Sequence, residues 1–554
     1  MAASHRLAPL ADGLFDLLVV GGGITGAGVA RDAAGRGLRV ALAERDDLAS
    51  GTSSRSSRLV HGGVRYLEHG HLGLVFEASR ERRTLLRLAP HLVRPLAFTW
   101  PVYRGARVPR WKLAAGLALY DALALWGNVG RHRVLGAAGV LAREPALAAA
   151  GLTGGAAYWD AATDDSRLTL AVALGAEQRG AVVRTHAEVV GLRFAPDRDG
   201  ARVRASVRGR LPGDDGSVEV RARAVVNCAG PWADGVRALA EPRAPVAVRG
   251  AKGVHVLVPA DRLGVRGAVT LLGPRDGRVF FALPAGGSAA GQFAVIGTTE
   301  TPADAEPGAV RATAADVAYL LGAANHYFPD ARLVPADVVS AWAGLRPLAA
   351  AGVGGAGTGS ASREHAVHVD PRGVVTATGG KLTTYRSMAA DVVDRCAPLL
   401  GVGRLPASET ARGTLPGGDV ADPPRGVAAE EAAARAAAGD AAVSRRLAHA
   451  HGAAWRRVWA LAEADRALGA RLDPALPYVL AEFAHAAAHE HARTLADLLV
   501  RRAPVAFETR DHGRSAARAL APHVAAALGW DAAAQAEAVA AYDREAARLF
   551  AVNP

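Results

Sequence analysis

Hydrophobic and polar positions near the N-terminus predict one strand–helix–strand unit. Residues 15–20, FDLLVV, and residues 38–44, LRVALAE, are apolar runs of the length that a buried strand has. Between them, a glycine turn leads into residues 25–37, TGAGVARDAAGRG, which the pattern assigns to a helix. The order predicts a βαβ unit over residues 15–44.

Two later regions have the period of strands. Residues 182–230 are rich in β-branched residues and contain two alternating runs on either side of a turn at residues 212–216, PGDDG. Alternation around such a turn predicts a β-hairpin. Residues 245–300 alternate in the same way and should add to a sheet.

The C-terminal part of the chain has the period of helices. Residues 405–426 are rich in Pro and Gly and are typical of a linker. Beyond them, residues 428–550 are dominated by Ala, Leu, Arg and Glu at helical spacing. This pattern predicts a separate, all-helical C-terminal domain.

The glycine turn carries a nucleotide-binding signal. Gly21, Gly23 and Gly26 form GxGxxG directly after the first strand, and Glu44 ends the next strand. The glycines allow the tight turn, the approach of backbone to a pyrophosphate and the close packing of helix on strand. The helix N-terminus then faces the phosphates. Glu44 can accept hydrogen bonds from the adenosine ribose and would repel a 2′-phosphate, which argues against NADP and leaves NAD and FAD open.

Composition narrows the class of protein without naming it. The chain has 554 residues, enough for two or three domains, and half of them are hydrophobic. The net charge is +12, almost all of the excess being Arg. That charge is compatible with nucleic acid, an anionic membrane surface, an anionic substrate or a solvated composition bias. The two cysteines, Cys228 and Cys396, form no CxxC pair and fit a reducing cytoplasm.

No segment of the sequence predicts a membrane crossing. The first apolar run is too short for a signal peptide. The longest later stretch, residues 113–126, falls short of the ~20 residues that a spanning helix needs. Residues 103–127 combine basic side chains and Trp111 with that stretch, which fits either an interfacial membrane anchor or a buried helix. We expect a cytoplasmic protein, with peripheral attachment to the inner face of the membrane left open.

Several sequence blocks together carry a family resemblance. They are SSRSSRLVHGGVRYLE (53–68), NCAGPWAD (227–234), GAKGVHVLVP (250–259), IGTTETP (296–302), WAGLRPL (342–348), SREH (362–365) and GGKLTTYR (379–386). They resemble the FAD-dependent, aerobic, quinone-linked glycerol-3-phosphate dehydrogenases, within the wider D-amino-acid-oxidase-like flavoproteins. Residues 481–502 are similar to the helical C-terminal domain of the same family.

The resemblance implies a fold that is α/β plus all-α. A Rossmann-like FAD domain and an antiparallel-sheet substrate domain, together D-amino-acid-oxidase-like, would span residues 15–400, followed by a linker at 401–426 and a helical C-terminal domain at 427–550. The FAD-binding parts would be about 15–90, 160–235 and 365–400, and the substrate-binding parts about 91–159 and 236–364.

The resemblance also implies an activity and its partners. The chain would bind FAD and oxidise sn-glycerol 3-phosphate to dihydroxyacetone phosphate, with electrons passed to a quinone. A membrane surface and a homo-oligomer stay open as partners, and no nucleic acid is expected. No metal is expected either, because Glu482, His485 and His489 share a helical face without forming HExxH.

By match to the family, five residues would hold the substrate phosphate: Arg65, Tyr66, Arg346, Arg363 and Lys381. Arg suits a phosphate because its guanidinium presents a rigid fork of donors. His255, in the alternating run GVHVLV, is the candidate base for the C2 hydroxyl and a further substrate contact. Arg346 and Lys381 are also candidate catalytic residues, because a cation that stabilises the forming alkoxide could matter as much.

A larger set would bind the cofactor. Its members lie in the glycine turn, after the second strand, in the Ser-rich block, after residue 227 and in the GGKLTTYR block. They are Gly21, Gly23, Ile24, Thr25, Gly26, Glu44, Arg45, Thr52, Ser53, Ser54, Arg58, Leu59, His61, Gly62, Ala229, Gly230, Gly379, Gly380, Lys381, Leu382 and Thr383. Residues 379–382 would begin a helix whose N–H groups face the reduced flavin.

Two rival functions stay open. One is a flavin oxidase or dehydrogenase of an amino acid or a 2-hydroxy acid, although a single carboxylate does not need a cluster of four cations. The other is a basic flavoprotein that binds nucleic acid. That function would want basic and aromatic residues interleaved, and aromatics are only 5% of the chain.

Overall fold

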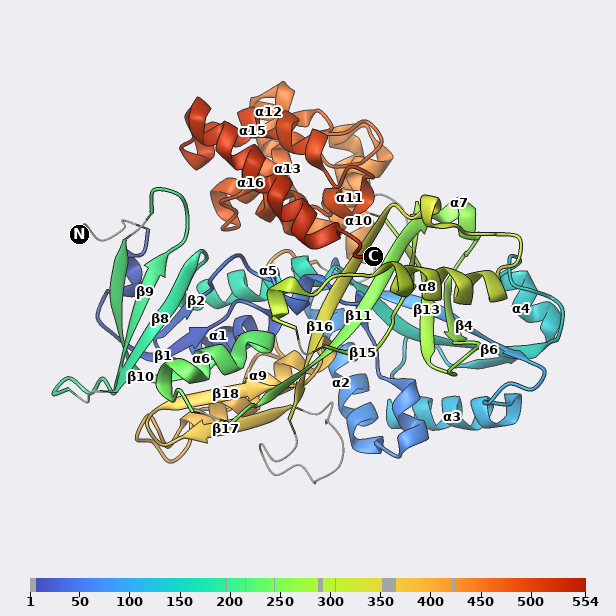
Figure 1. Ribbon diagram of the computed structural model, residues 1–554, viewed down its shortest axis with the longest axis horizontal. Coiled ribbons are helices and arrows are strands. Elements are labelled where there is room, and N and C mark those ends of the chain that lie inside the picture. Colours follow the sequence, from blue (N-terminus) through green and yellow to red (C-terminus); the bar gives the residue numbers. More distant parts are fainter. Residues whose placement is uncertain are drawn as a thin grey trace.

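The computed structural model describes residues 6–194, 197–214, 216–243, 245–286, 292–303, 305–350, 365–420 and 425–554. Two β-sheets lie side by side, and a group of C-terminal helices covers one side of both (Figure 1). This is the predicted α/β plus all-α fold.

The first sheet is of the Rossmann type. Its main path runs β17-β18-β10-β1-β2-β7, and the neighbours from β18 to β7 are parallel. The bounds are β1 (Leu14–Val20), β2 (Val40–Ala43), β7 (Val182–Arg184), β10 (Ser217–Asn227), β17 (Ala366–Asp370) and β18 (Val374–Thr378). The predicted hairpin forms between β9 (Val203–Gly209) and β10, and β8 (Ala187–Phe194) extends it.

Helices pack on the Rossmann sheet because its strands are apolar on both faces. One face is buried against α1 (Ile24–Gly35), α5 (Asp165–Glu177) and α9 (Tyr385–Cys396). The other face is buried against the β8–β9 hairpin and α6 (Ala233–Ala240). The predicted βαβ unit is therefore β1, α1 and β2.

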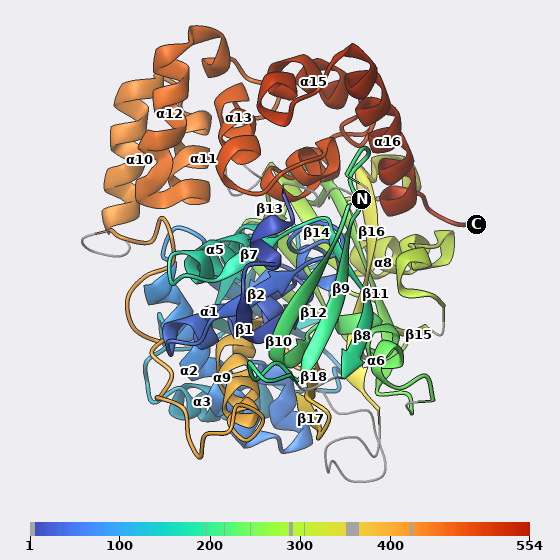
Figure 2. The same ribbon diagram turned by 90° about the vertical axis from the view of Figure 1, so that its left-hand side faces the viewer.

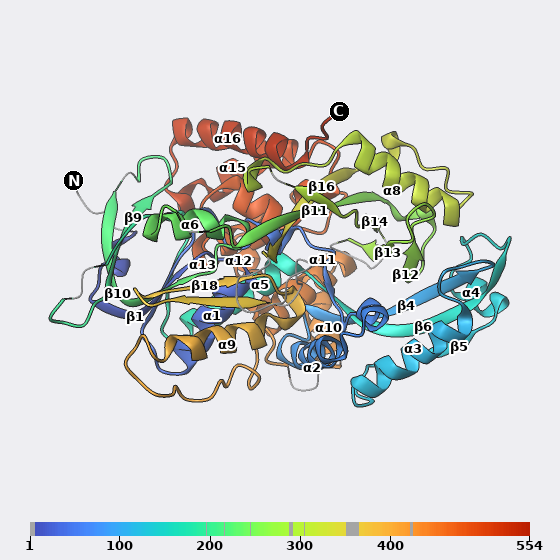
Figure 3. The same ribbon diagram turned by 60° about the horizontal axis from the view of Figure 1, so that its bottom comes forward.

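The second sheet has ten strands and is antiparallel except where β12 meets β4. Its bounds are β3 (Leu59–Val60), β4 (Val93–Tyr103), β5 (Arg133–Leu135), β6 (Leu152–Thr163), β11 (Val248–Pro259), β12 (Ala268–Leu272), β13 (Val279–Ala285), β14 (Phe293–Gly297), β15 (Thr301–Ala303) and β16 (Ser340–Ala349). Its helices are α2 (Leu72–Leu88), α3 (Arg110–Leu123), α4 (Ala137–Arg143), α7 (Ala260–Leu263) and α8 (Ala314–Tyr327). Among these, α3 runs alongside β4 and β6 at the edge of the molecule (Figure 3).

The C-terminal region is helical, as the spacing predicts (Figure 2). It contains α10 (Arg425–Ala438), α11 (Ala441–His451), α12 (Trp455–Ala464), α13 (Leu480–His489), a π-helical turn (Asp497–Arg502), α14 (Val505–Glu508), α15 (Arg514–Leu528) and α16 (Ala532–Phe550). It shares a hydrophobic core with the second sheet. In this core the rings of Phe507 and Trp342 pack edge to face, with 5.1 Å between their centres.

The segment before these helices packs on the Rossmann domain. Residues 401–420 contain no helix or strand, yet Thr410 and Leu415 are buried. Arg31 of α1 donates a hydrogen bond of 3.1 Å to the Thr410 carbonyl oxygen. The predicted linker is therefore held along α1 over this stretch. None of the described helices combines the length and the apolar character that crossing a bilayer requires.

Candidate active site

A cavity of about 700 Å³ opens between the two sheets. The segments that follow β1, β2, β10 and β18 all line it, so it lies at the carboxyl ends of the parallel strands. That edge is where open α/β sheets bind their ligands. The second sheet supplies the opposite wall through residues of β4, β11, β13 and β16.

Two glycines of the GxGxxG motif, Gly21 and Gly26, pack too tightly for a side chain. Gly21 has φ +106°, and a Cβ on it would lie 2.7 Å from the carbonyl oxygen of Cys228. A Cβ on Gly26 would lie 1.9 Å from the Gly21 carbonyl oxygen. Gly26 thus packs α1 against β1 and does not line the cavity. Gly21, Gly23, Ile24 and Thr25 do line it, so the N-terminus of α1 faces the cavity.

Glu44 lies at the end of β2 and holds the glycine turn. One carboxylate oxygen accepts a 2.5 Å hydrogen bond from the Gly22 N–H, and the other accepts a 2.8 Å bond from the Asp46 N–H. Burial raises the pKa of Glu44. Next to it, the Arg45 guanidinium lies 5.2 Å from the centre of the Trp232 ring, and both residues line the cavity.

The Ser-rich block contributes to the wall of the cavity, although some of its residues point elsewhere. Thr52, Ser53, Leu59 and His61 line the cavity. The Ser53 hydroxyl accepts a 3.0 Å hydrogen bond from the Ile24 N–H at the start of α1. Burial lowers the pKa of His61 to about 4, so its ring is neutral near pH 7.

Three predicted cofactor residues in this block lie outside the cavity. The Ser54 hydroxyl turns back toward the Gly51 carbonyl oxygen, 3.4 Å away. The Arg58 guanidinium stacks over Phe507 of the C-terminal region at 5.0 Å. Gly62 packs below the cavity, where a Cβ would lie 2.3 Å from the Tyr120 hydroxyl. Ser54, Arg58 and Gly62 therefore do not line the cavity that most of the other predicted cofactor residues share.

The later cofactor blocks follow β10 and β18. Ala229 and Gly230 line the cavity just after β10, and Gly379 to Thr383 line it just after β18. Gly379 and Gly380 have φ of +72° and +82°, which other residues seldom adopt. The helix expected to begin at residues 379–382 begins later. A 3₁₀ turn covers Leu382–Thr384, and α9 starts at Tyr385.

The residues predicted to hold phosphate that the structure describes gather at one end of the cavity. Arg65, Tyr66, Arg346 and Lys381 all line it. Lys381 Nζ lies 3.8 Å, and the Arg65 guanidinium 5.2 Å, from the centre of the Tyr66 ring. Burial lowers the pKa of Arg346, whose Nη2 donates a 3.3 Å hydrogen bond to Thr298. Arg363 lies outside the described residues.

His255 lies in β11 beside these cations. Its Nε2 is 2.9 Å from the Ser57 hydroxyl oxygen, and its ring stacks on Trp342 at 5.4 Å. Burial, together with the charges of Arg346 and Arg58, lowers the pKa of His255 to about 3. The imidazole is therefore neutral near pH 7 and able to accept a proton.

The sequence blocks contained further cavity residues that were not singled out. Ser57 and Thr298 belong to quoted blocks and hydrogen-bond to His255 and Arg346. Arg55 and Trp232 also line the cavity, and burial lowers the pKa of Arg55 to about 10. The signal that could have identified these four residues was their presence in the sequence blocks that carry the family resemblance. What the sequence lacked was any way to tell which face of each segment points inward.

The histidine face of α13 serves a structural network. Glu482 accepts hydrogen bonds from Arg446 at 2.9 Å and from His451 at 3.2 Å. In the described residues, His451, His485 and Glu490 lie close enough together to ligate a metal jointly. However, Arg167 already contacts two of these three groups. Its guanidinium donates to both oxygens of Glu490 and lies 3.2 Å from His451 Nδ1.

The cavity residues fit FAD. A pyrophosphate can lie on the glycine turn, and a ribose can lie against Glu44. At the far end, two buried atoms of cavity residues, His255 Nδ1 and Arg346 Nη1, have no hydrogen-bond partner among the described residues. Buried polar atoms of this kind are usually satisfied by a ligand or by water.

Fold and cavity together define a dinucleotide-binding oxidoreductase. Residues 16–386 match the FAD dependent oxidoreductase family, and residues 408–535 match the C-terminal domain of alpha-glycerophosphate oxidase. The protein is therefore an FAD-dependent enzyme.

Individual relatives narrow the class. Glycerol-3-phosphate dehydrogenase 2 of Mycobacterium bovis is 41% identical over 94% of this chain and 86% of its own length. The structure of glycerol-3-phosphate dehydrogenase from Bacillus halodurans, complexed with FAD, is 31% identical with a TM-score of 0.78, covering 99% of this chain and 98% of its own. Glycine oxidase from Geobacillus kaustophilus, at 24% identity and a TM-score of 0.52, covers 69% of this chain and 95% of its own; it shares the fold. The chain belongs to the FAD-dependent glycerol-3-phosphate dehydrogenase family.

Ser53 and Ser54 offer a matched test of the cavity wall. We expect Ser53→Ala to weaken FAD binding about fivefold, because the loss of a helix-capping hydroxyl costs about 1 kcal/mol. Ser54→Ala should leave the affinity unchanged, since the Ser54 hydroxyl faces away from the cavity. Fluorescence titration of the FAD-depleted protein with FAD measures both. Equal losses in the two variants would contradict this assignment.

Proposed function

We propose that the chain oxidises sn-glycerol 3-phosphate at C2 to dihydroxyacetone phosphate and passes the electrons to a quinone. The observation that carries the proposal is the cluster of Arg65, Arg346 and Lys381 beside His255, at one end of a cavity that fits FAD. The names of the relatives support the same substrate. When bound, FAD supplies the acceptor for the hydride from C2.

The charge of the cluster favours a phosphate over a carboxylate. A phosphate monoester carries close to two negative charges near pH 7 and offers three acceptor oxygens. Three cations around one site balance a dianion, whereas an amino acid or a 2-hydroxy acid brings a single carboxylate. The Arg346 side chain is half-buried, so its contact with the phosphate would be made in a partly dry environment, where charge-assisted hydrogen bonds are strong.

His255 is our candidate for the group that takes the proton of the C2 hydroxyl. Its neutral ring is held by Ser57 and Trp342, which fix the ring plane. A phosphate dianion bound beside Arg346 would raise the pKa of His255, because it offsets a positive charge that lowers it. Substrate binding would thus make His255 a stronger base. Arg346 and Lys381 would stabilise the alkoxide as the proton leaves.

A quinone acceptor requires contact with a membrane, and one surface suits that contact. Around α3, Trp111 is 74% exposed and Trp126 is 58% exposed. Leu119 and Leu125 are exposed nearby, and Lys112 is on the same helix. Exposed tryptophans with basic neighbours are typical of a helix that lies in the lipid interface. This surface is at the end of the molecule away from the C-terminal helices (Figures 1 and 2). We propose peripheral attachment through α3.

The substrate is tested by anaerobic reduction. We expect sn-glycerol 3-phosphate to bleach the flavin absorbance near ~450 nm promptly, because C2 delivers a hydride to FAD. Arg346→Gln should raise the half-saturating substrate concentration about 100-fold, since a hydrogen bond to a charged group contributes about 1.5–3 kcal/mol. Arg412→Gln, on the exposed linker, is the control.

Two outcomes would overturn the substrate assignment. One is a flavin that ignores sn-glycerol 3-phosphate and is bleached by an amino acid or a 2-hydroxy acid. The other is an Arg346→Gln variant with unchanged substrate dependence. Adding a soluble quinone analogue or oxygen to the bleached enzyme then shows which acceptor restores the colour faster.

The role of His255 is tested by turnover and its pH dependence. We expect His255→Ala to lower kcat about 100-fold or more, the usual contribution of a general base, with a smaller change in KM. In the unmodified free enzyme, a pKa of about 3 leaves His255 neutral from pH 5 to 8. Accordingly, kcat/KM should show no acid limb from an imidazole near ~6.5. His326→Ala, on the exposed side of α8, is the control. Near-normal turnover in His255→Ala would remove it from the mechanism.

Membrane attachment is tested with vesicles. We expect the protein to sediment with vesicles that contain anionic lipid at low salt and to be released at high salt, because basic groups near lipid headgroups are screened by ions. Replacing Trp111 and Trp126 with Gln should reduce binding at least tenfold. Val246→Gln, which changes an equally exposed apolar residue outside the α3 region, should not. Absence of binding at low salt would rule out this anchor.

A further inference from the structure

The loop after β2 forms one wall of the cavity. In this loop, residues 44–53, which we call the β2 loop, the two ends line the cavity and the middle, residues 47–49, is buried. The Ala49 N–H donates a 3.1 Å hydrogen bond to the Gly22 carbonyl oxygen, while Glu44 accepts the Gly22 N–H. The shape of the β2 loop therefore sets the glycine turn on which the pyrophosphate lies.

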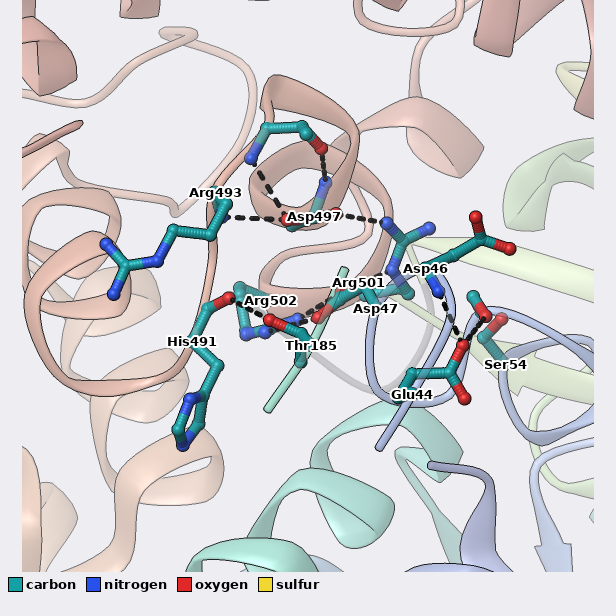
Figure 4. A network of polar contacts seen from close by, with 12 residues as sticks. Glu44, Asp46, Asp47, Ser54, Thr185, His491, Arg493, Asp497, Arg501 and Arg502 are labelled. Carbon is teal, nitrogen blue, oxygen red and sulfur yellow. Dashed lines mark hydrogen bonds and ion pairs between the residues drawn. The ribbon is translucent and has the colours of Figure 1, made fainter. Parts of the chain in front are cut away.

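Asp47, in the middle of the β2 loop, is held by the C-terminal region. Its side chain is fully buried and receives Arg501 Nε at 2.5 Å, Arg502 Nη1 at 2.7 Å and Arg502 Nη2 at 2.8 Å (Figure 4). Both arginines belong to the π-helical turn Asp497–Arg502. More than 450 residues of chain separate the partners, so this contact is purely tertiary.

Arg501 and Arg502 also form hydrogen bonds to groups other than Asp47. Asp497 accepts a 2.5 Å hydrogen bond from Arg501 and a 2.9 Å bond from His186 Nε2. Arg502 donates to the Glu490 carbonyl oxygen through Nε at 3.0 Å. Arg501 therefore bridges two buried carboxylates, and the two positive charges are balanced by two negative ones. Such a buried group is rigid, because each member would be left as an uncompensated charge if another moved.

A second connection runs from the same group to the β2 loop. The His186 N–H donates a 2.6 Å hydrogen bond to the Asp46 carbonyl oxygen, and the next residue, Ala187, donates to the Glu44 carbonyl oxygen at 2.8 Å. Asp497 thus reaches Asp46 through His186, and the arginines reach Asp47 directly. In the part of the chain that the structure describes, no residue after 424 lines the cavity. Any effect of these arginines on the cofactor must therefore pass through intervening residues, namely the β2 loop and, by way of His186, Ala187, which also lines the cavity.

We propose that Arg501 and Arg502 are positioning residues for FAD. By holding Asp47, they fix the β2 loop so that Glu44 and Ala49 present the glycine turn in its binding shape. This inference rests on FAD binding and is independent of which substrate is oxidised. It gives the C-terminal helices a defined role, since FAD binding and the docking of these helices on the Rossmann domain become coupled. Such coupling is reciprocal, so bound FAD also strengthens the docking.

The test is FAD affinity in the full-length protein, measured without substrate. Asp47→Asn keeps the shape of the side chain and removes the charge that Arg501 and Arg502 hold. After FAD is removed and titrated back, we expect its Kd to rise about tenfold, a usual size for coupling between two sites. Arg502→Gln should give a similar rise, so the inference stays testable if one variant fails to fold.

A matched control separates positioning from general destabilisation. Arg167 of α5 makes an equally buried, two-pronged ion pair to the C-terminal region, with hydrogen bonds of 2.7 and 2.9 Å to Glu490. Its guanidinium partners, Glu490, His451 and Ala450, all lie outside the β2 loop. Arg167 pairs with the Glu490 carboxylate, whereas Arg502 donates to the Glu490 carbonyl oxygen, which the Arg167 substitution leaves in place. Arg167→Gln should lower the thermal unfolding midpoint about as much as Asp47→Asn and leave the Kd for FAD within about twofold of the unmodified protein.

Because the coupling between FAD binding and helix docking is reciprocal, hydrogen exchange provides a second measurement. Hydrogen exchange of the backbone amides in residues 497–502 should slow when FAD is added to the unmodified protein, and this protection should shrink in Asp47→Asn. A tenfold rise in Kd in Asp47→Asn or Arg502→Gln, absent from Arg167→Gln, supports the proposal. Unchanged affinity in both test variants, or equal losses in all three variants, overturns it. The proposed substrate can fail without affecting either result.

Discussion

The contact between α1 and β1 at the glycine turn is the constraint on which the cavity depends. With a hydrogen in place of a Cβ at Gly26, the helix approaches to a distance that any side chain would prevent. That approach aims the first N–H groups of α1 at the carboxyl edge of the parallel sheet. The segments after β2, β10 and β18 then meet the helix N-terminus at the same edge. A cofactor that carries two phosphates matches a helix N-terminus placed in this way.

The opposite end of the cavity depends on a balance of electrostatic charge. Cations held close together in a partly desolvated site destabilise a fold unless something offsets them, and here Arg346, Arg65 and Lys381 converge at one end of the cavity. Glu300 lies 3.7 Å from Arg346 and offsets part of the charge. The remaining positive potential is what an anionic substrate would neutralise. Burial keeps the pKa of His255 low, and the charge of Arg346 lowers it in the same direction. In the proposed reaction, a bound anion would offset that charge, so substrate binding and proton transfer would be linked through Arg346.

Much of the fold follows from local patterns. The apolar runs around the glycine turn predicted β1, α1 and β2, and the alternating runs around residues 212–216 predicted the β9–β10 hairpin. These patterns succeed because a strand buried on both faces, or on one, constrains every residue along it. The start of α9 was less predictable. Two glycines with positive φ and a 3₁₀ turn delay the helix to Tyr385, and such backbone states leave little trace in hydrophobic periodicity.

The site was predictable to the level of the segment and less so to the level of the side chain. Ser53 and Ser54 are chemically identical neighbours, yet only Ser53 turns to the helix N-terminus. Arg58 has the chemistry of a phosphate ligand but stacks on Phe507, which comes from a region that the sequence places in another domain. Asp47 shows the same limit more clearly. Nothing in its local sequence distinguishes it from a solvated acid, because its partners, Arg501 and Arg502, are defined only when the C-terminal helices dock. A buried charge can be recognised only from the tertiary structure that buries it, which is why the contact between the C-terminal region and the β2 loop could not be predicted from the sequence.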